Sequence, residues 1–84
     1  MASMESDPER QLEAELLQAH ADNNRAALID LYTQAADLSE ASGQIDATCF
    51  FLTHAYVFAL ESDSPQARQL NKQLVTYGRE VPLP

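Results

Sequence analysis

The sequence predicts an all-α protein of four antiparallel helices packed as two helical hairpins. Apolar residues recur three and four positions apart in four separate segments, which is the spacing of one face of a helix. The two glycines and four prolines all lie where these segments begin or end. No segment alternates apolar and polar residues in the manner of a half-buried strand. Because the connections are short, each helix is expected to run antiparallel to the one before it.

The first helix is predicted over residues 8–21. One way to start it uses Asp7 as the N-cap and Pro8 as the first helical residue. The other way is a capping box between Ser6 and Glu9. The apolar face of this helix consists of Leu12, Leu16 and Ala19.

The second helix is predicted over residues 24–42, after a polar break at 22–24 whose side chains suit both a turn and an N-cap. Gly43 follows its last turn and is expected to adopt the left-handed conformation that ends many helices. The expected apolar side consists of Leu28, Leu31, Tyr32, Ala35 and Leu38, with Ile29 and Ala36 on its flank.

The third helix is predicted over residues 44–62 and the fourth over residues 65–77, with Ser64 as cap, Pro65 at the first position and Gly78 as the stop. The third helix is apolar nearly all round, which is typical of a helix covered on several sides. It is therefore expected to be the central element. Its three apolar stripes are Ile45, Cys49, Leu52 and Tyr56; Phe51 and Phe58; and Phe50 and Val57.

Length and charge narrow the range of functions. A chain of 84 residues allows a single domain over residues 1–84, with flexible ends expected at 1–6 and 79–84. The net charge is −8, and the first forty residues alone contribute nine acidic and two basic side chains. This charge disfavours nucleic acids and anionic membranes as partners. We see no targeting or membrane-spanning segment, and the single cysteine favours a reducing compartment, so a cytoplasmic location is expected.

A family resemblance appears in the second and third helices. Tyr32 is an aromatic residue with a small residue, Ala36, four positions on. Gly43 follows at the turn, and Ala55 is a small residue in the next helix. This pattern over about 34 residues resembles a tetratricopeptide-type hairpin. The sequence departs from the family pattern at Ser39, Thr48 and Leu52. The terminal proline of the pattern is also displaced, to Pro65, because the third helix is longer than that of the family. The resemblance implies two hairpins of this type and a protein-binding module. The run 46–61 also resembles small, uncharacterised bacterial helical proteins.

The residues most able to do chemistry are Cys49 and His54. Their spacing of five places them about 140° apart on a helix, so they do not form a catalytic pair. Cys49 is expected to be a buried structural thiol, and His54 a hydrogen-bonded packing residue or a partner contact. No zinc or calcium spacing is present, and the only other histidine is His20. We therefore predict no enzyme activity, no metal and no cofactor.

Surplus apolar surface on the third helix is the strongest functional signal. Leu52 and Tyr56 are expected in the core, whereas Phe50 and Val57 lie beside polar residues and are expected to be partly exposed. The first and fourth helices could instead cover this surface. The predicted partner-binding residues are Phe50, Val57, His54 and Phe58.

These observations predict a non-enzymatic protein-interaction module, such as an adaptor or regulator. Its acidic front half favours a protein partner with a basic surface, and a homodimer is the other arrangement left open. The alternative hypothesis is a small-molecule sensor with a pocket between helices, using Tyr32, Tyr56 and His54.

Overall fold

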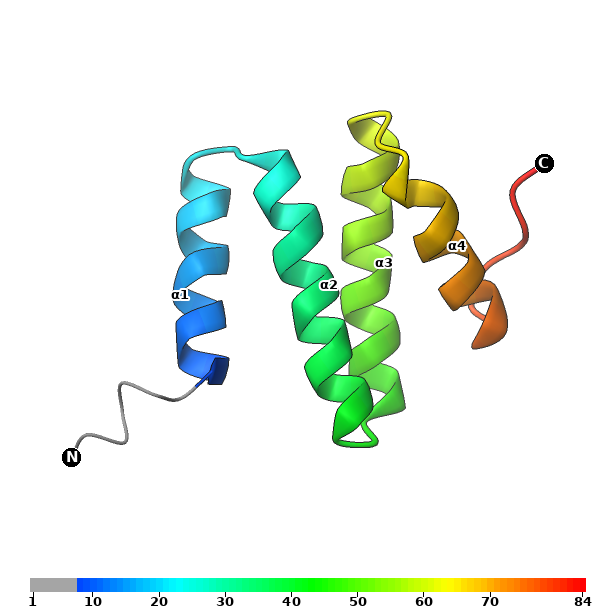
Figure 1. Ribbon diagram of the computed structural model, residues 1–84, viewed down its shortest axis with the longest axis horizontal. Helices are drawn as coiled ribbons and strands as arrows, with labels where there is room; N and C mark the ends of the chain where they lie inside the picture. Colours follow the sequence, from blue (N-terminus) through cyan, green and yellow to red (C-terminus); the bar gives the residue numbers. More distant parts are fainter. Residues whose placement is uncertain (1–7) are drawn as a thin grey trace.

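The computed structural model describes residues 8–84 and places four α-helices in that part of the chain (Figure 1). The observed helices begin and end within one or two residues of the predicted bounds, which confirms the four-helix, all-α prediction. Both proposed caps of the first helix, Asp7 and Ser6, lie outside the described residues. The bounds are α1 Pro8–Ala21, α2 Arg25–Ala41, α3 Ile45–Glu61 and α4 Gln66–Thr76.

The helices lie side by side in chain order, each antiparallel to the one before it (Figure 1). The extents are 50 × 30 × 14 Å, so the third dimension is close to the thickness of a single helix. The contact between α2 and α3 is the most extensive, while α1 packs on α2 and α4 packs on α3. Within residues 8–84, no helix is long and apolar enough to cross a membrane.

All four helices end in the same way, with one residue in the left-handed region. Gly43 (φ +75°) and Gly78 (φ +74°) adopt it as expected, and Asn23 (φ +55°) and Asp63 (φ +56°) adopt it in the other two turns. After α2, the Gln44 amide donates to the Ser39 carbonyl (2.9 Å) and the Gly43 amide donates to the Glu40 carbonyl (3.0 Å). This pair of bonds is the Schellman motif, and the same pair recurs after the other helices.

We expect Gly43→Ala to lower the free energy of unfolding by about 1 kcal/mol, as measured by urea denaturation. A Cβ at this position would meet no atom within 4 Å, so the cost comes from the positive φ alone and not from a clash. Gly43→Asn is the matched control and should cost less, because asparagine tolerates this conformation and Asn23 adopts it at the equivalent place. An unchanged stability of Gly43→Ala would contradict this account of the turn.

The starts of α2 and α4 agree with the predicted caps. The Asn24 side chain accepts a hydrogen bond from the Ala27 amide (3.1 Å) at the start of α2. Before α4, the Ser64 hydroxyl accepts from the Gln66 amide (3.2 Å), and Pro65 already has helical dihedral angles.

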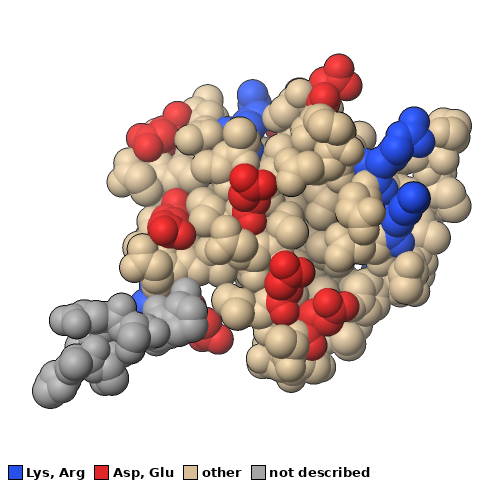
Figure 2. Space-filling view, viewed as in Figure 1, with Lys and Arg blue, Asp and Glu red and all other residues tan. Residues whose placement is uncertain are grey.

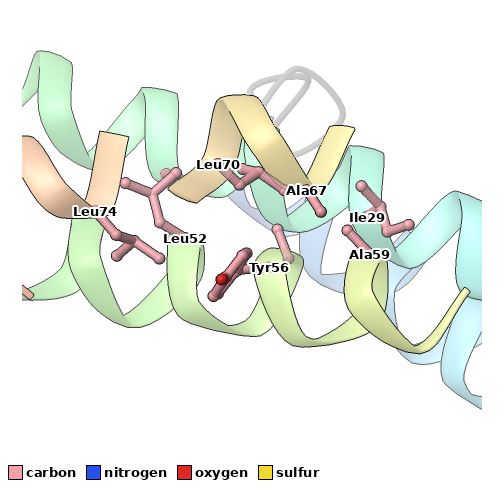
Figure 3. Packing of buried hydrophobic residues seen from close by; sticks show 9 residues of the cluster. Ile29, Leu52, Tyr56, Ala59, Ala67, Leu70 and Leu74 are labelled. Carbon is pink, nitrogen blue, oxygen red and sulfur yellow. The ribbon is translucent and has the colours of Figure 1, made fainter. Parts of the chain in front are cut away.

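The core consists of two clusters on opposite sides of α2. One lies between α1 and α2, and the other joins α2, α3 and α4 (Figure 3). Leu52 and Tyr56 are buried in the second cluster, as predicted. The first cluster comprises Leu12, Ala19, Leu28, Leu31 and Ala35. The second comprises Ile29, Ala36, Leu52, Ala55, Tyr56, Ala59, Ala67, Leu70 and Leu74.

The assignment of faces on α2 was partly wrong. Ile29 and Ala36, expected on the flank, are almost fully buried, whereas Leu38, expected on the apolar side, is 40% exposed. The reason is that α2 has a neighbour on each side, so two faces are buried instead of one. For the same reason α3 is not the sole central helix, because α2 and α3 share that position. Ile45, at the first position of α3, is also exposed.

The chain after α4 folds back against the helices. The side-chain amide of Asn71, a residue 3% exposed, donates to the Val81 carbonyl (2.9 Å) and to the Tyr56 hydroxyl (3.3 Å). Its side-chain oxygen accepts from the Leu83 amide (3.1 Å). Asn71 therefore joins residues 81–83 to α4 and α3.

Two polar contacts hold the residues just after α4 against α2 and α3. The Tyr77 hydroxyl donates to the Glu40 carboxylate, and this bond is the main reason that the pKa of Tyr77 is raised, because it favours the protonated phenol. The Arg79 guanidinium donates to Asp46 (2.9 Å), which raises the pKa of Arg79. These contacts connect the residues just after α4 to the last turn of α2 and the first turn of α3.

Candidate functional site

Four residues of α3 were predicted to bind a partner, and they differ in exposure. Phe50 and Val57 are 56% and 44% exposed, which confirms the predicted exposure, while their role in binding stays a prediction. His54 and Phe58 are half-buried. Phe58 stacks on Tyr32 with ring centroids 6.0 Å apart and packs against both core clusters. Its ring therefore supports the fold, and only part of it faces solvent.

His54 lies between aromatic rings. Its Nδ1 is 3.0 Å from the Phe50 carbonyl oxygen, a distance at which an Nδ1–H donates to that oxygen. Its ring centroid lies 4.4 Å from that of Phe50 and 5.0 Å from that of Tyr32. This is the geometry of a hydrogen-bonded packing histidine, which is the first of the two roles expected for it.

Cys49 is a buried free thiol, 2% exposed, in the second turn of α3. Its backbone carbonyl accepts from the Thr53 hydroxyl (2.8 Å), which is a local helix contact. Among residues 8–84, no three side chains of the types that bind metals come together.

A groove runs along one face of the first three helices. The walls are α1 and α3, α2 lies between them and forms the floor, and the enclosed volume is about 590 Å³. Most of the lining is apolar. From α1 it includes Leu12, Leu16 and Leu17, from α2 Tyr32, Ala35 and Leu38, and from α3 Ala47, Phe50 and Phe51.

The groove has a closed end and an open end. At the closed end His20 of α1 meets α3, because its ring centroid lies 6.0 Å from that of Phe58 and its Nε2 lies 2.9 Å from the Tyr32 hydroxyl. Burial beneath this contact raises the pKa of Tyr32 above its ordinary value of 10.0. From their turn, α1 and α2 diverge toward the other end of the hairpin (Figure 1). The divergence opens the groove beside Glu9 and Glu13 of α1.

Large apolar side chains in the groove remain in contact with solvent. Leu17 is 66% exposed and stands on the α1 wall, opposite the 56% exposed Phe50 on the α3 wall. Leu38 adds a third exposed apolar side chain on the floor. Exposed apolar side chains that share one hollow are typical of a surface that binds another molecule.

The charged lining of the groove is acidic. Glu9 and Glu13 are the carboxylates that line it, and Arg and Lys are absent from its lining among the described residues. On the molecular face of Figure 2, most acidic side chains lie over the α1 and α2 side, two basic side chains lie over α4, and another basic side chain lies near the start of α2. The carboxylates therefore give the groove lining itself a negative charge.

Sequence reasoning found one wall of the groove and missed the other. Phe50 is among the predicted binding residues, whereas Leu17 and His20 of the other wall are not. The adjacent pair Leu16 and Leu17 is the signal that could have identified this wall, because it widens the apolar stripe of α1 beyond what one neighbour covers.

The three residues of the alternative pocket hypothesis do not come together as one lining. Tyr32 and His54 are in contact, with ring centroids 5.0 Å apart. Tyr56 is buried in the contact between α3 and α4, where its hydroxyl accepts from Asn71. Tyr32 alone of the three lines the groove.

Comparison with other proteins leaves the description at the level of the fold. No protein-family model, no curated protein and no solved structure matches this chain. The structure itself shows that residues 8–84 form a small all-α protein of four helices packed in chain order.

Proposed function

We propose that the protein is a non-enzymatic protein-interaction module whose docking surface is the groove between α1 and α3. The observation that carries this proposal is the set of exposed apolar side chains, Leu17, Leu38 and Phe50, that line one hollow. Water leaves such a surface when a complementary apolar surface covers it, and this release favours association. Phe50 supplies an aromatic anchor of the kind enriched in binding hot spots. The cytoplasm is the expected setting, where the thiol of Cys49 stays reduced.

The proposal includes a tetratricopeptide-like arrangement of two hairpins. It is supported by the small residues of the resemblance, because Ala36 is 1% and Ala55 is 0% exposed where α2 and α3 pack together. The left-handed Gly43 at the turn also agrees with it. Packing of adjacent hairpins is how such modules present a binding surface.

A second candidate function is the sensing of a small apolar molecule. The groove volume of about 590 Å³ favours it, because small-molecule sites have volumes of about 300–1,000 Å³. The exposure of Leu17 and Phe50 favours the protein partner instead, since a site for a small molecule usually surrounds its ligand.

The test is Phe50→Ser, which we expect to keep the helical content and to abolish capture of the partner. The substitution removes an exposed aromatic ring from the groove without opening the buried core. The tagged chain would be used to capture proteins from its cell of origin, with circular dichroism to check the fold and mass in solution to check association. Leu60→Ser is the matched control, because Leu60 is a similarly exposed residue of α3 (49%) outside the groove lining.

The proposal requires a protein that wild type and Leu60→Ser capture and that Phe50→Ser does not. Equal capture by all three chains would contradict it. If Phe50→Ser unfolded the chain, Phe50 would belong to the core and the docking surface would be wrong. A small molecule that copurified with wild type, and was lost in Phe50→Ser, would establish the second candidate.

A further inference from the structure

We propose that the groove receives a basic amphipathic helix from another protein, with its apolar face toward α2 and its lysine or arginine residues beside Glu9 and Glu13. This inference rests on the proposed function, since it names the kind of partner that the interaction module binds. It follows from the secondary structure of the groove, from its shape and from the sign of its charge.

A helix is the partner that this surface can accept through side chains alone. Residues 8–84 form helices, turns and an extended tail, so the groove offers no strand edge to which a peptide backbone could hydrogen-bond. A bound helix satisfies its own backbone groups and needs only an apolar stripe in contact with the groove. On the α1 wall, Leu12 and Leu16 are four positions apart, and Leu17 lies beside them. Apolar ridges of two helices interdigitate at such spacings.

The shape of the groove sets where the charged end of this helix lies. The contact of His20 with Phe58 and Tyr32 closes one end. A helix therefore leaves through the open end, beside Glu9 and Glu13. The wall from Glu9 to His20 is roughly 17 Å long at 1.5 Å per residue, which is about three turns of a bound helix. Basic residues on the departing turn would face the two carboxylates, and apolar residues would face Leu17 and Phe50.

The charge also argues against a second copy of the chain as the occupant. Each copy carries a net charge of −8, and residues 1–40 carry most of it. A dimer through the groove would bring two negative surfaces together, which is unfavourable, whereas a basic helix would be attracted.

The experiment measures binding of labelled peptides to the full chain by fluorescence anisotropy. The probe is a fluorescein-labelled peptide of about 14 residues, with leucines three and four positions apart and lysines toward one end. A second peptide has glutamate in place of lysine, and a third has the leucines and lysines of the first in scrambled order. Circular dichroism follows helix formation, and sedimentation equilibrium gives the mass of the protein.

Two matched pairs of variants locate the binding site. Glu13→Gln and Glu15→Gln make the same charge change on α1, but Glu13 lines the groove and Glu15 lies outside its lining. Leu17→Gln and Leu60→Gln make the same apolar-to-polar change, and again only Leu17 lines the groove. All four positions are exposed, so each variant is expected to fold.

We expect the lysine peptide to bind, to gain helix on binding and to bind more weakly as salt rises from about 50 to about 500 mM. Glu13→Gln should weaken it about threefold and Leu17→Gln about tenfold. Glu15→Gln and Leu60→Gln should change the affinity by less than about twofold. The glutamate and scrambled peptides should bind much more weakly than the lysine peptide.

Five outcomes would overturn the inference. If the glutamate peptide bound as tightly as the lysine peptide, the carboxylates of the groove would not select a basic partner. If the scrambled peptide bound as tightly, the groove would not recognise an amphipathic helix. Equal effects of Glu13→Gln and Glu15→Gln would mean general attraction to an acidic protein. A dimer that Leu17→Gln dissociates would identify a second copy as the occupant. If no peptide bound while Phe50→Ser still lost its captured protein, the helix would be wrong and the interaction module would stand.

Discussion

Leu52→Ala is expected to lower the free energy of unfolding by about 2–5 kcal/mol, a large share of the stability of so small a domain. Leu52 is 1% exposed and lies in the cluster that joins α2, α3 and α4, where Figure 3 shows it among buried residues of α3 and α4. Removing its isobutyl group takes away buried apolar contacts and leaves a cavity that the surrounding helices fill only in part. Urea denaturation followed by circular dichroism measures the loss.

Leu60→Ala is the control for this prediction. Leu60 lies on the same helix and is 49% exposed, so the same truncation should cost less than about 1 kcal/mol. Similar losses for the two variants would mean that the second cluster does not hold α4 in place. If Leu52→Ala lowered both the free energy of unfolding and the slope of that free energy with urea concentration, the result would point instead to a loosened native state.

Asn71→Ala is expected to cost about 1–3 kcal/mol and to release the end of the chain from α4. Asn71 is the only buried residue with an amide side chain among residues 8–84, and its hydrogen bonds involve Val81, Leu83 and Tyr56. The substitution leaves the Leu83 amide and the Val81 carbonyl without this partner. Denaturation measures the stability, and hydrogen exchange at the Leu83 amide measures the release of the tail.

Gln69→Ala is the matched control, because Gln69 is an exposed amide residue on the same helix. It should change the stability by less than about 0.5 kcal/mol and leave the exchange of Leu83 as in wild type. Should the Leu83 amide exchange at the wild-type rate in Asn71→Ala, the hydrogen bonds of Asn71 would not be what keeps the tail in place.

Local signals in the sequence were enough to determine the helices and their ends. Helical periodicity and the caps depend on residues a few positions apart, so they are independent of how the helices pack. Gly43 shows this directly, because its place after a periodic segment predicted the positive φ that the turn contains. The buried positions of Leu52 and Tyr56 and the exposure of Phe50 and Val57 followed from the same periodicity, read against the polar residues beside them.

The candidate site depends on how the helices pack against one another, which the helical periodicity of the sequence does not specify. The groove lies where α1 diverges from α2, with His20 of α1 in contact with Phe58 of α3 at one end. Leu17 remains exposed on its wall. Ile29 is buried and Leu38 is exposed because α2 has a neighbouring helix on each side. The contact of Asn71 with Val81 joins residues ten positions apart through a tail without helical spacing. A sequence pattern fixes the angle of a residue around its own helix, whereas only the packing of whole helices decides what that angle faces.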